Sequence, residues 1–357
     1  MRTWYRMACV LLAVMLGAGQ ALASPPPPGD IPQAVVVMYH RFGENRYPST
    51  NIRPEQVRDH LARLRQDQAV VLPLETIVGA LESGTPLPER ATAITVDDGY
   101  GSVYQVGWPL LRAAGVPWTL FVNTETVGQS GYMTWAQLRE LAAAGVTIGA
   151  HSHSHAHFPA LTPEQQRADL LTMQAAFQKE LGQQPRLFAY PYGEADGPSM
   201  ALLREMGYRA AFGQQSGVVA TSEDRFYLPR FALNEHYGSA EFFVPRISAR
   251  ALPVRDVTPA VPLAPVQGAG NPPAVGFTVT DPQLSLARLT CYGPSGEALT
   301  TRQSPQSNGT RIELVLNKPL TKGRSRLNCT LPIPGPNGKG PRWYWWGTQI
   351  VVPGAWD

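Results

Sequence analysis

The sequence predicts an α/β protein whose parallel sheet closes into a barrel, followed by a small β-rich module. Two observations favour this fold. Between residues 34 and 206, short apolar runs alternate with segments whose apolar residues recur every three or four positions. Beyond residue 275 the runs become short and alternating, and turn sequences separate them. The first pattern is typical of repeated β–α units, and the second of an antiparallel sheet.

The first region contains six predicted strands and the helices between them. Helix starts are marked by Pro54, by a capping box beginning at Thr134, and by Pro163, and glycines such as Gly115 and Gly182 mark helix ends. The strands are predicted at 34–39, 70–72, 91–96, 118–122, 146–150 and 187–190. The helices are predicted from residue 54 and at 74–81, 103–114, 134–144, 163–181 and 200–206.

Two adjacent aspartates, Asp97 and Asp98, stand where the predicted strand 91–96 ends. Their charges repel each other and lose hydration at a strand end, so a compensating group is expected. A metal ion would compensate by binding one carboxylate while the other stays free as a base. Gly99 allows the backbone to turn, so that both side chains can reach one site. A solvated Asp-Gly turn is the alternative that this motif alone leaves open.

A second stretch, His151-Ser152-His153-Ser154-His155-Ala156-His157, follows the predicted strand 146–150. Imidazole is a common zinc ligand, and histidines at positions i and i+4 can share one ion. An aspartate with two histidines makes three protein ligands and leaves a position for water, as in a catalytic zinc site. The alternatives are a solvated His-rich loop and a ligand pair shifted by two residues.

Together these motifs resemble those of the polysaccharide deacetylase family, which is carbohydrate esterase family 4 or the NodB homology domain. The family motif T-F-D-D-G appears at residues 95–99 with Val96 in the Phe position, and H-S/T-x-x-H appears at residues 151–155. The motif R-x-P-Y-G appears as Ala189-Tyr190-Pro191-Tyr192-Gly193. The resemblance covers about residues 33 to 235 and implies a distorted (β/α) barrel of the NodB type, often seven-stranded.

The resemblance also implies the metal site. The residues that would hold a zinc ion, or another divalent metal such as cobalt or nickel, are Asp98, His151 and His155. The family register argues against the shifted pair His153 and His157. A bound zinc ion would acidify a water and polarise an acetamido carbonyl, and Asp97 would take the proton from the attacking water.

The third motif is implied to serve the substrate. In the family, the backbone N–H of its tyrosine, here Tyr192, stabilises the oxyanion of the intermediate. Substrate binding is accordingly assigned to Pro191, Tyr192 and Arg230.

The chain departs from the family pattern at two points. The Arg that helps to hold the base is Ala189 here, and Arg230 is a candidate to replace it, with a surface salt bridge as the alternative. The late L-x-H motif that supplies the acid is not obvious, because His236 is mis-spaced for it. His40 resembles the early Y-H motif of biofilm poly-N-acetylglucosamine deacetylases, which share the A-Y-P-Y-G variant. We therefore favour His40 over His236 as the acid that protonates the leaving amine.

These residues predict a metal-dependent N-deacetylase that acts on N-acetylhexosamine units of an exported polysaccharide. Within the enzymes, a peptidoglycan or O-acetyl glycan deacetylase is the alternative. Outside them, Ala189 and the missing L-x-H motif favour a glycan-binding protein on a degenerate barrel.

The N-terminus predicts export. Residues 1–23 read as a signal peptide, with Arg2 and Arg6 before an apolar run and Ala21-Leu22-Ala23 as the cleavage site. The run is short for a membrane span, so a periplasmic or secreted protein with no stable span after cleavage is expected, and a retained anchor is the alternative. The formal net charge of +3 is spread along the chain and indicates no nucleic-acid partner.

The predicted divisions after the signal peptide are a deacetylase domain at 24–250, a Pro-rich linker at 251–274 and a β module at 275–357. The linker contains six prolines. Cys291 and Cys329 are an even pair in an exported protein and predict a disulfide. Trp343-Tyr344-Trp345-Trp346 could stack on sugar rings, but we favour one pair in the module core and the other packed on the barrel.

Overall fold

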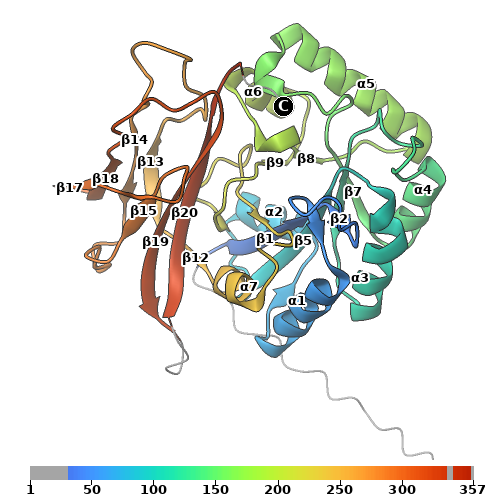
Figure 1. Cartoon of the computed structure of the whole chain (residues 1–357), viewed down its shortest axis with the longest axis horizontal. Helices are drawn as coiled ribbons and strands as arrows, with labels where there is room; N and C mark the ends of the chain where they lie inside the picture. Colours follow the sequence, from blue (N-terminus) through green and yellow to red (C-terminus); the bar gives the residue numbers. More distant parts are fainter. Residues whose placement is uncertain (1–30, 336–340, 355–357) are drawn as a thin grey trace, which may run out of the picture.

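The computed structural model describes residues 31–335 and 341–354 and confirms the predicted α/β class. A curled, mostly parallel sheet with helices around it is followed by two smaller β sheets (Figure 1). The predicted signal peptide at 1–23 lies outside the described residues. Within the described residues, no helix combines the length and the apolar character that a membrane crossing requires.

The large sheet has the strand order β10-β1-β5-β6-β7-β8-β9, with β4 beside β5 and β11 beside β1. All six predicted strands are present. β10 runs antiparallel to β1, and the other pairs in this sheet are parallel. The strands are β1 (Gln33–Tyr39), β4 (Val70–Val71), β5 (Ala91–Asp97), β6 (Thr119–Val122), β7 (Thr147–Ala150), β8 (Leu187–Ala189), β9 (Ala210–Phe212), β10 (Val219–Ala220) and β11 (Phe231–Ala232). A separate pair is formed by β2 (Arg41–Phe42) and β3 (Asn51–Ile52).

The helices follow the predicted order with two local differences. The predicted helix 103–114 begins as a π-helix, η1 (Val103–Gly107), where a Cβ on Gly107 would lie 2.8 Å from the Phe42 ring. The last predicted helix begins earlier than expected, because Asp196 caps it. The α-helices are α1 (Pro54–Gln66), α2 (Leu74–Ser83), α3 (Trp108–Ala114), α4 (Trp135–Ala143), α5 (Pro163–Leu181), α6 (Gly197–Glu205) and α7 (Ala240–Ile247), and two short 3-10 turns are η2 (Phe158–Ala160) and η3 (Pro191–Gly193).

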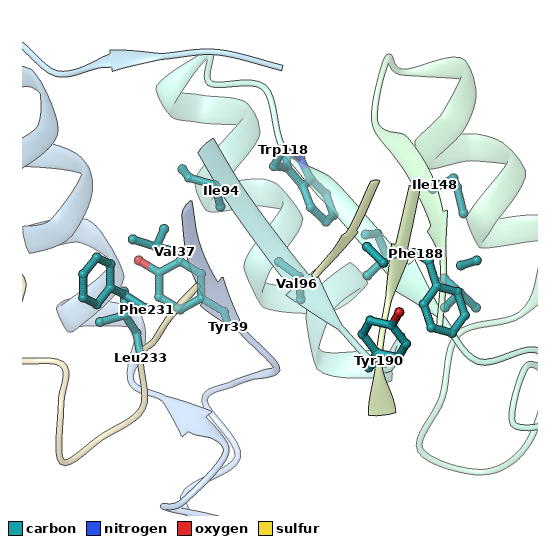
Figure 2. Close-up of a cluster of buried hydrophobic side chains, with 14 of the residues drawn as sticks. Val37, Tyr39, Ile94, Val96, Trp118, Ile148, Phe188, Tyr190, Phe231 and Leu233 are labelled. Atoms are coloured by element: carbon teal, nitrogen blue, oxygen red, sulfur yellow. The ribbon is translucent and has the colours of Figure 1, made fainter. Parts of the chain in front are cut away.

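Alternate residues of the long strands β1 and β5 belong to two different cores, as the strand period requires. One set, which includes Val37, Val96 and Phe188, packs against the surrounding helices (Figure 2). The other set, which includes Ala93 and Phe121, lies on the inner face of the sheet, where α2 also packs. Side chains that continue the inner set beyond the strand ends therefore point into the barrel.

The segment 228–232 closes the barrel. Leu228 bridges Phe212 at the end of β9, and β11 pairs with β1. Leu228 belongs to the inner core and Phe231 to the outer one. Arg230, two residues after Leu228, is therefore placed on the inner face.

The C-terminal module contains two sheets with a shared core. A five-stranded sheet has the order β12-β20-β19-β15-β16, and a four-stranded sheet has the order β13-β14-β18-β17. Between them lie buried side chains that include Phe277, Leu327 and Trp346. The strands are β12 (Arg250–Ala251), β13 (Val254–Thr258), β14 (Val275–Val279), β15 (Thr290–Tyr292), β16 (Ala298–Leu299), β17 (Thr301–Gln306), β18 (Gly309–Leu314), β19 (Gly323–Pro334) and β20 (Pro341–Val352).

The predicted linker at 251–274 is wrong in its first part. Residue 251 belongs to β12, and residues 254–258 form β13, so both are strands of the module sheets. The sequence pattern did not predict these strands, because they are short and prolines lie between and after them. Residues 262–264 also bond to Val351 of β20. The module therefore begins near residue 250.

Three of the four residues of the Trp-rich run pack as we favoured. The ring of Trp345 lies 5.1 Å from Phe231 of the barrel, and Trp346 lies 4.4 Å from Phe277 in the module core. Tyr344 also packs against the module core. The β20 strand thus joins the two parts of the protein.

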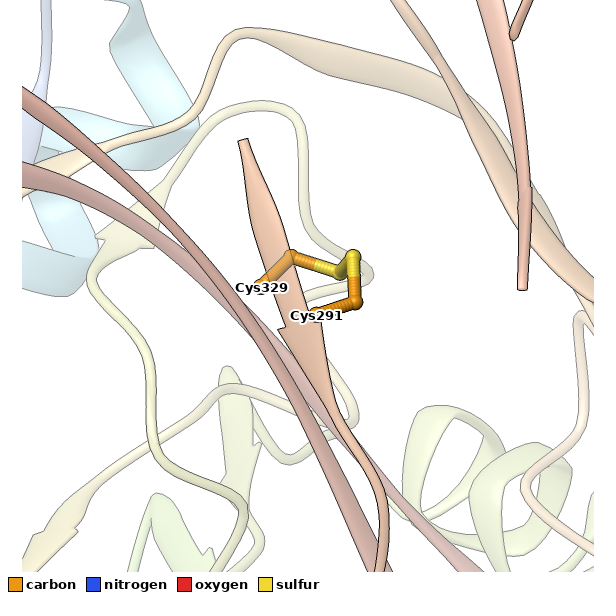
Figure 3. The surroundings of a disulfide bond; sticks show 2 residues. All are labelled: Cys291 and Cys329. Atoms are coloured by element: carbon orange, nitrogen blue, oxygen red, sulfur yellow. A yellow bond between two sulfur atoms is a disulfide. The ribbon is translucent and has the colours of Figure 1, made fainter. Parts of the chain in front are cut away.

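The predicted disulfide is present between Cys291 and Cys329, which lie directly opposite each other on β15 and β19 (Figure 3). Replacing both residues by alanine is expected to lower the free energy of unfolding by about 4 kcal/mol, from the chain-entropy model for this loop length. Chemical denaturation followed by the tryptophan fluorescence of the module would measure the change. A loss below about 1 kcal/mol would contradict this entropic account.

Candidate active site

Asp97 lies on the inner face at the end of β5 and is held by Arg230. The two carboxylate oxygens accept hydrogen bonds from Nη1 and Nη2 of Arg230, each at 2.7 Å. Arg230 also donates to the Thr95 hydroxyl at 3.2 Å and to the carbonyl of Gly213 at 2.9 Å. Both Asp97 and Arg230 are fully buried. Burial raises the pKa of Asp97, but the Arg230 guanidinium and His151 outweigh it and hold that pKa below its usual value.

The full burial of Arg230 corrects one sequence prediction. Its guanidinium donates hydrogen bonds to Asp97, Thr95 and Gly213, and none of its surface is exposed. Arg230 therefore orients Asp97 and is not placed to bind substrate.

Asp98, His151 and His155 converge on one point. The Oδ1 atom of Asp98 lies 3.2 Å from Nε2 of each histidine. Within the described part of the chain, the buried atoms Asp98 Oδ1 and His151 Nε2 have no partner in hydrogen-bonding geometry. Burying polar atoms without partners is costly, and ligand atoms that converge in this way fit a divalent cation. These three are the group of possible metal ligands found among the described residues.

The surroundings of the three groups also suit a metal. Nδ1 of His151 lies 2.7 Å from the carbonyl of Ala189, to which its N–H can donate, leaving Nε2 free for a metal. Burial raises the pKa of Asp98, but the His151 and His155 rings outweigh it, so that the pKa lies well below its usual value. Asp98 is thus available as an anionic ligand.

The interleaved histidines, His153 and His157, do not belong to the converging group, and each has a side-chain partner of its own. The Nδ1 atom of His153 lies 2.8 Å from the hydroxyl of Thr124. The Nδ1 atom of His157 lies 2.7 Å from the buried carboxylate of Glu194. The backbone N–H of His155 donates to the Ser152 hydroxyl at 2.9 Å, which helps to set the loop.

Several site residues have a left-handed backbone that non-glycine residues rarely adopt. The φ angles are 75° at Asp98, 65° at Ser152, 56° at His155 and 58° at Tyr192. Such strain gathers at functional sites because the surrounding structure must hold it in place. Here it turns the ligand side chains and the Tyr192 loop toward one region.

His40 lies at the same end of the sheet, directly after β1. Burial lowers the pKa of its imidazole, although the carboxylates of Asp98 and Asp97 act in the opposite direction. β1 and β5 pair in parallel with Tyr39 opposite Val96, so His40 follows at the level of Asp97. His236 is exposed on the loop after β11, where its backbone N–H bonds to Asn234. The structure therefore brings His40 to the aspartates.

Tyr192 lies in η3, beside the metal ligands. Its ring is 4.6 Å from that of His155 and stacks on that of His157 at 3.9 Å. The neighbouring Pro191 is buried. The Nε2 atom of Gln349, a residue of β20, donates to the carbonyl of Tyr192 at 3.1 Å. Sequence reasoning missed Gln349, because no local motif marks a glutamine in a distant strand.

Comparison with known proteins identifies the domain that carries these motifs. Residues 84–211 match the family model described as polysaccharide deacetylase. The chain carries a polysaccharide deacetylase domain. One relative of this domain is named as an N-deacetylase, a hydrolase of carbon–nitrogen bonds other than peptide bonds.

Curated proteins and solved structures resemble the deacetylase domain, and three of them serve as examples. A Bacillus subtilis protein named as a polysaccharide deacetylase, YxkH, is 24% identical over 208 residues, which are 58% of this chain and 74% of that protein. The poly-beta-1,6-N-acetyl-D-glucosamine N-deacetylase of Escherichia coli (strain K12) is 28% identical over an alignment of 216 positions that covers 48% of this chain and 32% of that protein. The Streptococcus pyogenes deacetylase PplD in complex with acetate aligns with a TM-score of 0.57 at 19% identity, over 62% of this chain and 99% of that one. The structural match confirms the expected distorted barrel.

The deacetylase domain carries Ala189 where the family motif has Arg, and the geometry explains how it tolerates this change. Ala189 ends β8 on the inner face. The Arg230 guanidinium reaches Asp97 from the closing segment 228–232 instead. A charged group from a different part of the chain thus contacts the same aspartate.

Proposed function

We propose that the protein is a zinc-dependent N-deacetylase that removes acetyl groups from N-acetylhexosamine units of an exported polysaccharide. The observation that carries this proposal is the buried set Asp98, His151 and His155 beside an Asp97 that Arg230 holds ionised. Zinc would be held by the first three residues, where it would supply an acidified water and a polarised acetyl carbonyl.

The other groups of the chain would divide the proton transfers. Asp97 does not belong to the ligand set and would accept the proton of the attacking water. The N–H of Tyr192 would donate to the oxygen that becomes negative. His40 would protonate the leaving nitrogen.

The substrate class rests on the relatives. The Escherichia coli relative is named as a poly-beta-1,6-N-acetyl-D-glucosamine N-deacetylase, although this chain spans only 32% of its length. We therefore propose an N-acetylglucosamine polymer as the substrate. The predicted signal peptide would place the reaction in the periplasm or outside the cell.

Acetate release tests the function. The full-length mature protein, loaded with zinc, is expected to release acetate from a poly-N-acetylglucosamine polymer. A chelator should abolish the release, and added zinc or cobalt should restore it, because the ligand set supplies three of the metal's contacts. Peptidoglycan and an O-acetylated glycan belong in the same panel. Release from the O-acetylated glycan alone would contradict the N-deacetylase, and binding without release from any polymer would favour a glycan-binding protein.

A further inference from the structure

The C-terminal module presents one row of β20 to the barrel. Residues of β20 alternate between two surroundings, as expected for a strand. Trp346 and Ile350 lie in the module core, whereas Trp345 packs on the barrel. In the barrel-facing row, a Cβ on Gly347 would lie 2.1 Å from the carbonyl oxygen of Ser216, so only glycine allows this approach. The next residue of the row is Gln349.

The Gln349 side chain joins the module to the loop that contains Tyr192. It is fully buried, and its Nε2 donates to the carbonyls of Tyr192 and Gly193 at 3.1 and 3.0 Å. Its Oε1 accepts a hydrogen bond from Nε of Arg326, the residue directly opposite on β19, at 3.0 Å. Both ends of the carboxamide are therefore satisfied, and its orientation is determined.

Two further side chains contact the loop that contains Tyr192. The hydroxyl of Tyr227, a barrel residue, lies 3.1 Å from the carbonyl of Gly193 and 3.2 Å from the carbonyl of Gln349. Arg324 of β19 lies over the Tyr192 ring, with 5.2 Å between its guanidinium carbon and the ring centroid. The module thus contacts the backbone and the ring of the Tyr192 loop.

These contacts hold a strained conformation. Tyr192 has a left-handed backbone with φ 58° and ψ 3°. Carbonyls need hydrogen-bond partners, and Gln349 of the module donates to those of Tyr192 and Gly193, while Tyr227 of the barrel also donates to that of Gly193. Because the carbonyl and the N–H of Tyr192 belong to the two peptide planes that meet at its Cα, holding the first restricts where the second points.

We infer that the C-terminal module completes the active site, and that Gln349 is a positioning residue that aims the Tyr192 N–H at the developing oxyanion. This inference rests on the proposed deacetylase function. A displacement of about 1 Å in a catalytic group can lower the rate by about 100-fold, so the hydrogen bonds of one buried carboxamide are enough to matter.

The test is an isosteric substitution in the full-length protein. Gln349→Glu replaces the donor by an oxygen that faces two carbonyls, and it is expected to lower kcat by about 10- to 100-fold with little change in KM. Zinc content should stay that of the wild type, because no metal ligand touches Gln349. Gln349→Met, which removes the donor without adding a charge, is the second variant and should show the same kcat defect.

Asn271 offers a matched control. It is a buried carboxamide inside the module that donates to the carbonyl of Leu320 and accepts from its N–H. Asn271→Asp therefore makes the same chemical change with no contact to the Tyr192 loop. It should keep the wild-type kcat even where it lowers the melting temperature as much as Gln349→Glu.

The outcomes separate the two proposals. Wild-type kcat in both Gln349 variants, with an active wild-type enzyme, would overturn the positioning role and leave the deacetylase function intact. Equal losses of kcat in Asn271→Asp and Gln349→Glu would also overturn it, because module stability would then explain both. A zinc-loaded wild-type protein that releases no acetate from any polymer would overturn the function and the inference together.

Discussion

Asp97→Asn is expected to keep its zinc and to lose about 10²- to 10⁴-fold in kcat, the usual contribution of one general base. The amide is nearly the same size as the carboxylate but cannot accept the proton of the attacking water. Asp98→Asn is expected to fail differently, because it removes a charged ligand and should therefore lose zinc. Elemental analysis of the purified variants, alongside acetate release, distinguishes the two failures. Equal zinc loss in both variants would show that the two aspartates do not divide these roles.

The structure requires a control for this experiment. Arg230 is fully buried and pairs with Asp97, so Asp97→Asn leaves a buried charge poorly compensated, at a cost of up to about 3–5 kcal/mol in stability. The double variant Asp97→Asn with Arg230→Met removes that charge. It should recover stability but not turnover. Recovery of turnover would mean that the defect of the single variant came from folding and not from a missing base.

His40→Ala is expected to lose about 10²- to 10⁴-fold in the hydrolysis of an N-acetyl substrate and far less in the hydrolysis of an O-acetyl substrate. An amide nitrogen must be protonated before it leaves, whereas an alcohol leaves more easily from an ester. The comparison needs both substrates and a zinc measurement on the same preparation.

His236→Ala is the matched control for the acid. It lies in the L-x-H region of the sequence, but its side chain is exposed. It should affect both substrates mildly. A selective loss of amide hydrolysis in His236→Ala, with His40→Ala unaffected, would reverse the assignment. If neither variant loses amide hydrolysis selectively, another group protonates the nitrogen, and an O-acetyl esterase becomes the better proposal.

The parts of this molecule that could be predicted from sequence are local. Asp98 follows one apolar strand and His151 and His155 follow another, and the carboxyl ends of parallel strands meet at one edge. The sequence pattern therefore predicts that these three side chains lie close together. The same applies to the helix that starts at the capping box of Thr134.

The parts that could not be predicted depend on contacts between distant segments. Arg230 could be suggested as a partner of Asp97, but its burial follows from the closing segment, whose strand β11 has only two residues and no readable period. Likewise, the sequence did not predict β13, because prolines flank this short strand. Gln349 has no motif at all, because its function arises from the packing of one sheet on a loop more than 150 residues earlier in the chain.

The left-handed backbone of the site limits how this protein can be made more heat-resistant. A design procedure that judged residues by conformational energy alone would choose glycine at Asp98, Ser152, His155 and Tyr192, since each such residue costs about 1–3 kcal/mol. At Asp98 and His155 those exchanges would remove two of the three proposed metal ligands together with the strain. Gln68 has the same backbone, with φ 56°, but it follows α1 at the opposite end of the sheet. Substitutions that aim to raise the thermal stability should therefore start at Gln68 and leave the four strained positions of the candidate active site unchanged.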